Sequence, residues 1–256
     1  MDFKLIELRR MGKIEIVRLM HPSINQEMVK ELETYFLSVR EDDEVGAVIL
    51  NGSGNGFFSE GFHSSQRSSF SPISAERFSR DGQSFLLLIE NLGKAVIAGV
   101  DGRASAEGFE LVLACPLRIA SEDAIFNLPQ VGLGLIPGWG GIHRLARIIG
   151  MSKALELILT GRDLAVLEAQ EIGLINRLVS REDLEKECLE MAETILTKGP
   201  VAVRLALEAI HRGIESSLEI GSALESSFMG LCYATEDKDE GLKAFFEKRS
   251  PNFKGE

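Results

Sequence analysis

The chain has 256 residues, of which 45% are hydrophobic, which is enough to build one main domain with a helical appendage. Its formal net charge of −11 argues against a broad nucleic-acid or anionic-membrane surface, because phosphate binding draws on clustered Lys and Arg. We expect neither a membrane span nor a signal peptide, because no apolar run has the required length and position.

Three cysteines, Cys115, Cys188 and Cys232, lie far apart and show no CxxC spacing. Each falls within an apolar or amphipathic helical pattern. Buried free thiols in a reducing compartment are therefore expected rather than disulfides, which favours a cytoplasmic protein.

The first half of the chain alternates strand and helix patterns. Residues 1–19 alternate apolar and polar positions as a hairpin does, and residues 26–44 carry one apolar stripe typical of an amphipathic surface helix. A buried strand is predicted at 46–51, and a helix containing Phe85 leads to another at 94–100. Because strand, helix and strand recur in this order, a parallel sheet is the simplest topology.

The segment 94–141 is the most informative one. After the strand at 94–100, the turn signal Asp101-Gly102 precedes a nearly continuous apolar helix, with Ser105 as a plausible N-cap. Glu107 and Glu110 then lie about one turn apart at the helix N-terminus, where unpaired N–H groups favour negative charge.

Two other regions frame this segment. The loop 52–69 combines many Gly and Ser residues with aromatic side chains that look exposed, and loops of this kind often carry function. From Gly138 onward the pattern is helical, with Gly150, Gly161 and Gly173 at positions that suit helix C-termini. The charged end, residues 234–256, fits either an ordered helix or a solvated tail.

Six stretches in order, SINQEM, GFFSEGF, KAVIAGVDG, GFELVLACPLRIASEDAIF, LGLIPGWGG and EGLKAFFEKR, together resemble the enoyl-CoA hydratase/isomerase (crotonase) superfamily. The resemblance covers nearly the whole chain. It implies an α/β fold of the ClpP/crotonase type, with a repeated ββα core at 1–195 and a C-terminal helical trimerisation region at 196–256. It also implies a homotrimer or a dimer of trimers, with no nucleic-acid or membrane partner.

The resemblance further implies an acyl-CoA thioester substrate, with no metal and no cofactor besides the coenzyme A that the substrate carries. The shared chemistry stabilises a thioester enolate with two backbone N–H groups, an oxyanion hole. By position, these donors are the N–H groups of Phe62 and of Glu107, where relatives commonly have glycine. Residues implied to hold the CoA portion are Ser23, Ile24, Asn25, Ser59, Glu60 and Gly61, with Phe245 and Lys248 contributed by a neighbouring subunit.

The hydratase pattern uses two glutamates. Glu110 matches the first, but the second position holds Gln130, whose amide cannot exchange a proton near neutral pH. Gln130 can still orient a water or a carbonyl, so either Glu110 acts as both base and acid, or Glu107 or His63 substitutes. Trp139 either narrows the acyl pocket or packs beneath it.

Hydration of a 2-enoyl-CoA is the leading hypothesis. Isomerisation, decarboxylation, hydration of a cyclic dienoyl-CoA, and silent CoA binding stay open as alternatives. RNA binding is disfavoured because the first helix is acidic, with Glu27, Glu31, Glu33 and Glu41.

Overall fold

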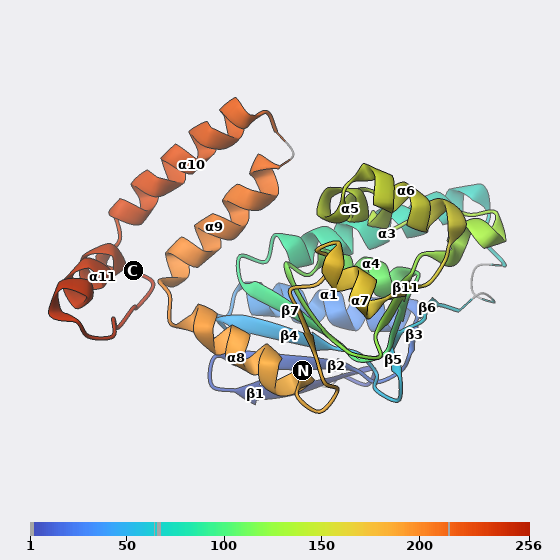
Figure 1. The fold of residues 1–256 in the computed structure, drawn as a ribbon, viewed down its shortest axis with the longest axis horizontal. Helices are drawn as coiled ribbons and strands as arrows, with labels where there is room; N and C mark the ends of the chain where they lie inside the picture. The colour runs from blue at the N-terminus through green and yellow to red at the C-terminus, as the bar shows by residue number, and fades with distance from the viewer. Residues whose placement is uncertain (1–2, 64, 66–67, 215) are drawn as a thin grey trace.

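The computed structural model describes residues 3–63, 65, 68–214 and 216–256 (Figure 1). Its centre is a six-stranded sheet in the order β1-β2-β4-β7-β9-β12. The strands are β1 (Ile6–Met11), β2 (Ile14–Leu19), β4 (Ala47–Asn51), β7 (Ala95–Val100), β9 (Leu117–Ser121) and β12 (Arg177–Val179). Among the described strands of this sheet, β1 and β2 pair antiparallel and all the other pairs are parallel, which confirms the predicted hairpin and the predicted parallel sheet.

Two smaller sheets lie beyond the carboxyl ends of the central strands. One has the order β11-β10-β8-β5, and the other pairs β3 with β6. Their strands are β3 (Ser23–Ile24), β5 (Phe57–Ser59), β6 (Gly61–Phe62), β8 (Arg103–Ser105), β10 (Ile125–Asn127) and β11 (Leu164–Ala165). A central strand, a strand of a smaller sheet and a helix therefore follow one another repeatedly, as the predicted ββα units require.

Helices cover both faces of the central sheet. One face packs against α1 (Gln26–Arg40), α3 (Pro72–Glu90) and α4 (Glu107–Ala114), and the other against α8 (Leu184–Leu196). In β7, Val96 and Ala98 belong to the first core while Ala95 and Ile97 belong to the second. This explains why the strand lacks polar positions: both of its faces are buried.

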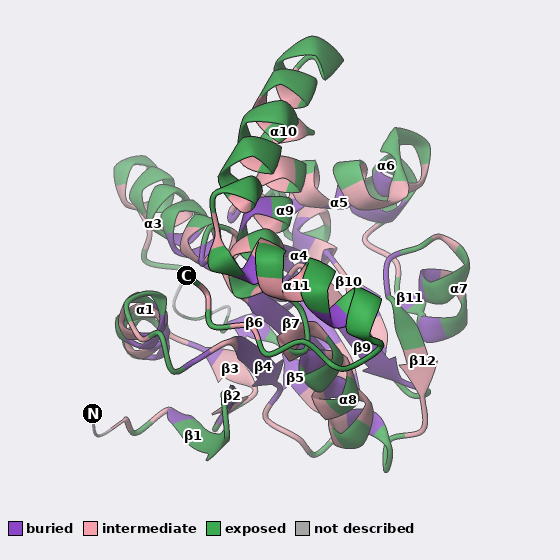
Figure 2. Ribbon diagram, turned by 90° about the vertical axis from the view of Figure 1, so that its left-hand side faces the viewer, coloured by how far each residue is buried: buried purple, intermediate pink, exposed green. Residues whose placement is uncertain are grey.

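The remaining helices form two groups. The short 3-10 helix η1 (Pro129–Leu133) precedes α5 (Gly141–Ile149), α6 (Met151–Thr160) and α7 (Val166–Glu171), while α9 (Pro200–Gly213), α10 (Leu218–Tyr233) and α11 (Glu236–Glu247) form an arm that projects from the core (Figure 1). Figure 2 shows α10 largely exposed, and none of its described residues is buried. The charged C-terminal segment is thus mainly helical. The division at 195/196 stays a prediction.

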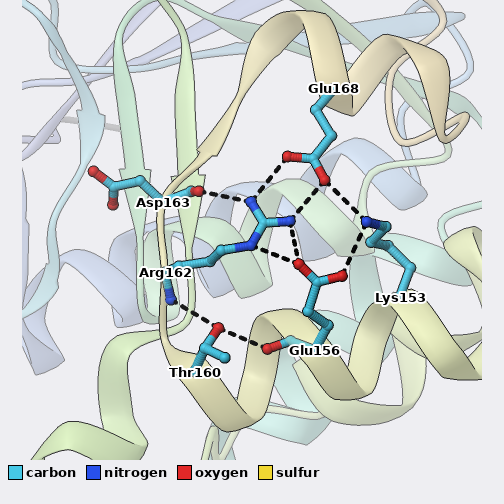
Figure 3. Close-up of polar contacts among 6 residues, drawn as sticks. All are labelled: Lys153, Glu156, Thr160, Arg162, Asp163 and Glu168. Atoms are coloured by element: carbon cyan, nitrogen blue, oxygen red, sulfur yellow. Dashed lines mark hydrogen bonds and ion pairs between the residues drawn. The ribbon is translucent and has the colours of Figure 1, made fainter.

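An ion-pair network joins α6 to α7 (Figure 3). Arg162 Nη2 donates to Glu168 Oε1 at 2.6 Å, and Arg162 Nε donates to Glu156 Oε1 at 2.8 Å. Lys153 Nζ lies 3.0 Å from the Glu156 carboxylate and 3.1 Å from the Glu168 carboxylate. The adjacent Gly161 lies against η1, because a Cβ atom on it would be 3.3 Å from the Cα of Pro129. The network therefore supports the turn that carries Gln130.

We expect Arg162→Gln to lower the free energy of unfolding by about 1 kcal/mol or less, because a third of the Arg162 side chain is exposed and solvent screens its ion pairs. Urea unfolding at low salt and at about 1 M NaCl measures this, and the difference should shrink at high salt. Arg9→Gln is the control, because Arg9 is more exposed and, among the described residues, forms an ion pair with one carboxylate, that of Glu185. A large loss that salt does not change would contradict the expectation.

Candidate active site

The buried helix α4 begins at a sharp reversal of the chain. Ala106 has φ +50 and ψ −125, a conformation that L residues rarely adopt. Its N–H donates to the Asn127 carbonyl at 3.1 Å, and its own carbonyl accepts from the Glu110 N–H at 3.0 Å. The prediction that Ser105 caps α4 is wrong: Ser105 ends β8, and Ala106 occupies the N-cap position without a capping side chain.

The two predicted oxyanion donors, on Phe62 and Glu107, lie close together. Gly61 makes this possible, because its φ is +77 and a Cβ atom on it would lie 2.8 Å from the Glu107 nitrogen and 2.7 Å from Glu107 Oε2. The Phe62 N–H donates to Glu107 Oε2 at 3.0 Å. Both residues are buried, with 6% and 1% of their surface exposed. The Glu107 carboxylate therefore occupies the Phe62 donor.

The segments predicted to hold CoA also come together. β3 pairs with β6, placing Ser23 opposite Gly61 and Ile24 opposite Phe62. The Ser59 hydroxyl donates to the Pro22 carbonyl at 2.8 Å. In the same segments, the Glu60 N–H donates to that carbonyl at 2.8 Å, and Asn25 Oδ1 accepts from the Met28 N–H at 2.8 Å as the cap of α1. Asn25 therefore uses its side chain to begin a helix.

Glu110 is fully buried on the first turn of α4. Its Oε1 accepts from the N–H groups of Trp139 and Gly141, both at 2.8 Å. Within the described part of the chain, no group donates to its Oε2. Burial, and next the charge of Glu107, raise the pKa of the Glu110 carboxyl to about 8, while the two N–H groups act in the opposite direction. A carboxyl group with such a pKa suits proton transfer near neutral pH.

Gln130 lies in η1 with 1% of its surface exposed. Neither its amide oxygen nor its amide nitrogen has a hydrogen-bond partner among the described residues. Leaving a buried amide without partners costs free energy, so this side chain is suited to meet a bound molecule. No hydrogen bond of the described region links its side chain to Glu107 or Glu110.

His63, the other candidate for the missing acid, is exposed. Its Nδ1 lies 2.8 Å from the Ser65 hydroxyl, within the same loop. Two aromatic residues of the same loop, Phe58 and Phe62, are buried, so the expectation of exposed aromatic side chains is wrong for them. The geometry therefore gives no support to His63 as a proton donor.

Trp139 packs beneath the site. Its ring lies 5.5 Å from that of Phe62 and 6.3 Å from that of Phe85, both edge to face. Gly82 on α3 permits this position, because a Cβ atom there would lie 2.1 Å from the indole nitrogen. The indole consequently fills the space behind the Phe62 donor and the Glu110 carboxylate.

Phe245 and Lys248 do not join the site within one chain. They lie at the end of α11, on the projecting arm, far from α4 (Figure 1). Phe245 is 77% exposed. Any contact with a CoA bound to this chain would have to come from a neighbouring subunit, as the resemblance implies.

The sequence reasoning missed the groups that hold Glu110. These are the backbone N–H groups of Trp139 and Gly141, at the start of α5, with Arg144 Nη1 donating to the Trp139 carbonyl at 2.7 Å. A signal existed, since a glycine-rich loop followed by a helix is a common anion-binding arrangement. The spacing of residues in the sequence does not show which carboxylate such a loop will bind.

The described residues form neither a metal site nor a membrane span. No group of three or more His, Cys, Asp or Glu side chains is arranged to hold a metal ion. Across the same residues, every helix is too short or too polar to cross a bilayer.

We expect Ala106→Gly to raise the free energy of unfolding by about 1 kcal/mol. Relief of backbone strain outweighs the greater entropy of the unfolded chain, because glycine adopts positive φ without a steric penalty. Chemical denaturation measures the change. Ala104→Gly in the adjoining strand is the control, because Ala104 has no positive φ and should only lose packing. Equal destabilisation by both substitutions would contradict the strain.

We expect the stability of Glu110→Gln relative to the unmodified chain to increase with pH. The folded pKa of about 8 exceeds the ordinary 4.5, so the unfolded chain releases this proton first and the unmodified protein loses stability as pH rises from about 4.5 to about 8. Gln cannot ionise, yet its oxygen can still accept from both N–H groups. The difference should reach about 2 kcal/mol or more.

Urea unfolding at several pH values, with the exposed Glu193→Gln as control, measures this difference. A difference that stays constant between pH 4.5 and 8 would show that the Glu110 pKa is not raised on folding.

Comparison with known proteins supplies the family. Residues 9–256 match the model of the family described as enoyl-CoA hydratase/isomerase. A protein of Clostridium acetobutylicum named short-chain-enoyl-CoA hydratase is 37% identical, over 97% of both chains. A crotonyl-CoA hydratase of Syntrophomonas wolfei is 36% identical over 99% of both.

Solved structures agree with this match. The crystal structure of an enoyl-CoA hydratase from Bacillus anthracis superposes with a TM-score of 0.95 at 36% identity, covering 99% of this chain and 100% of the other. An enoyl-CoA hydratase structure from Geobacillus kaustophilus gives a TM-score of 0.96 at 31% identity, covering 100% and 98%. These likenesses confirm the predicted fold class, and the chain belongs to the enoyl-CoA hydratase/isomerase family.

Proposed function

We propose that this protein is an enoyl-CoA hydratase that adds water across the α,β double bond of a short-chain 2-enoyl-CoA. One observation carries the proposal: a buried carboxylate, Glu110, is held by two N–H groups and lies one helical turn from Glu107, which is in hydrogen-bond contact with the Phe62 N–H. An acid/base group and an enolate site are the two parts that this reaction needs.

The proposed reaction proceeds through an enolate. The thioester oxygen accepts from the N–H groups of Phe62 and Glu107, which draws electrons from the β-carbon. Glu110 takes a proton as a water oxygen bonds to that carbon, and the π electrons of the double bond move onto the thioester as an enolate. Glu110 then returns the proton to the α-carbon, so that water is added overall and the carboxylate is regenerated.

Gln130 assists without exchanging a proton. Its amide oxygen can accept from the attacking water and its amide nitrogen can donate to it, and both atoms are buried without a partner in the described structure. Glu110 therefore acts as both base and acid in this proposal. Its raised pKa suits both roles, because a carboxylate of higher proton affinity is a better base toward water.

The packing behind the proposed oxyanion donors favours a short acyl chain. Trp139 is buried against Phe62, Phe78 and Phe85, immediately behind the donors and beside the backbone that holds Glu110. A relative named short-chain-enoyl-CoA hydratase supports the same range of substrates. We therefore infer that a four-carbon chain is preferred over a long one.

We also infer that CoA lies along Ser23–Asn25 and Ser59–Gly61 and that residues 196–256 assemble the chain into a homotrimer or a dimer of trimers. Exposed aromatic side chains on α11, Phe245 and Phe246, support the assembly, because large apolar side chains exposed on a projecting arm are suited to burial against a partner. With the partner's arm in place, Phe245 and Lys248 would reach the bound CoA. All three cysteines are free thiols, which fits the proposed cytoplasmic location.

A second reaction of the same enolate type is favoured by Gln130. With an amide at the second position, Glu110 can move a proton from one carbon to another or protonate an enolate left by decarboxylation. These outcomes differ from hydration in product mass: isomerisation leaves it unchanged, decarboxylation removes carbon dioxide, and hydration adds one water.

The test incubates purified protein with crotonyl-CoA and with trans-2-octenoyl-CoA and follows the conjugated thioester absorbance, with mass spectrometry of the product. We expect crotonyl-CoA to gain one water and to react faster than the longer substrate. Glu110→Gln should lower kcat by about 100-fold or more, because it removes the proton acceptor, whereas Glu193→Gln on α8 should not. No product from either thioester would refute the hydratase proposal.

A further inference from the structure

The side chain of Glu107 forms a hydrogen bond that the proposed oxyanion role of its backbone N–H does not require. Its Oε2 lies 3.0 Å from the Phe62 nitrogen and accepts that N–H, inside a region from which water is excluded. The Phe62 N–H is the group that the thioester oxygen needs. The resting site therefore already contains an oxygen at one of its two donors.

That oxygen resembles the reaction's own intermediate. A carboxylate oxygen and an enolate oxygen both carry partial negative charge, and both form strong, charge-assisted hydrogen bonds with a backbone N–H. A neutral thioester carbonyl is a weaker acceptor than either. The bound substrate must therefore displace a better acceptor before its own carbonyl can be polarised.

The surroundings hold the carboxylate in this place. Gly61 leaves room for it, since a Cβ atom there would lie 2.7 Å from Glu107 Oε2. Glu110, one turn along α4, bears the other buried carboxyl group, and burial and next the charge of Glu107 raise its pKa to about 8.

We propose that the Glu107 carboxylate is a specificity-determining internal competitor for the oxyanion hole, which weakens the binding of neutral acyl-CoA thioesters. This inference rests on the proposed acyl-CoA function. Because the bound substrate requires the Phe62 donor that the carboxylate occupies, the competitor raises KM. Saturated thioesters, which never form the enolate in this reaction, are bound less tightly for the same reason.

The test compares two ligands that differ only in the acyl group on the sulfur. Isothermal titration calorimetry measures the Kd of butyryl-CoA and of free CoA for the unmodified protein, Glu107→Ala and Glu107→Gln. Free CoA occupies the same nucleotide site but presents no thioester carbonyl oxygen. Glu193→Ala, on the exposed side of α8, is the matched control for loss of a helical glutamate.

For Glu107→Ala we expect butyryl-CoA to bind about tenfold more tightly, because a charged acceptor no longer holds the Phe62 N–H, and free CoA to change less than about twofold. Glu107→Gln should give a smaller gain, since its amide oxygen can still accept that N–H without a charge. Kinetics with crotonyl-CoA should show a lower KM. Unchanged or weaker butyryl-CoA binding by a folded Glu107→Ala would overturn the proposal.

A gain for free CoA equal to that for butyryl-CoA would also overturn it, because the effect would not then lie at the thioester. If Glu107→Ala does not fold, Glu107→Gln decides alone, with tighter butyryl-CoA binding required. The outcome is separate from the hydratase proposal: tighter thioester binding without turnover of any enoyl-CoA would keep this inference and reject hydration.

Discussion

The structure depends on the burial of two carboxyl groups on the first turn of one helix. Glu107 and Glu110 are 1% and 0% exposed, and a buried charge is tolerated only when hydrogen-bond donors replace the water that it loses. Three backbone N–H groups from outside the helix do this: that of Phe62 for Glu107, and those of Trp139 and Gly141 for Glu110. The Phe62 N–H comes from one segment and the Trp139 and Gly141 N–H groups from another, so the two carboxylates join segments that are far apart in the sequence.

The central sheet explains why these loops meet. β4, β7 and β9 run parallel in aligned register, so the connections that follow them all leave at one edge. The loop after β4 delivers Phe62, the reversal after β8 delivers α4, and the chain beyond β10 delivers Trp139. Packing of β7 on both faces fixes this edge, because a one-residue slip would turn its side chains to the wrong core. The site is therefore built from backbone groups whose positions follow from strand pairing.

The difference between local patterns and long-range contacts explains what could be predicted from the sequence. The strands at 46–51 and 94–100, the parallel order and the pairing of Glu107 with Glu110 on one helical turn follow from periodicity, which is local, and each is observed. The family resemblance predicted donors on Phe62 and Glu107; the two residues lie close together, and their donor roles stay a prediction. It could not show that the Glu107 carboxylate turns back onto Phe62, because that contact spans 45 residues and depends on a side-chain rotamer. The cap at Ser105 failed because nothing local marks Ala106 as a residue with positive φ.

The two departures from the family pattern are best understood together. The usual second glutamate is replaced by Gln130, and a carboxylate appears instead at Glu107, where glycine is common. Helix α4 carries two buried carboxyl groups, and the second lies at Glu107, beside the Phe62 N–H, rather than after Pro129. Its charge there still contributes to the raised pKa of Glu110, which keeps Glu110 suited to proton transfer. Because the same carboxylate also accepts from the Phe62 N–H, a single side chain acts both on the Glu110 pKa and on the proposed oxyanion donor.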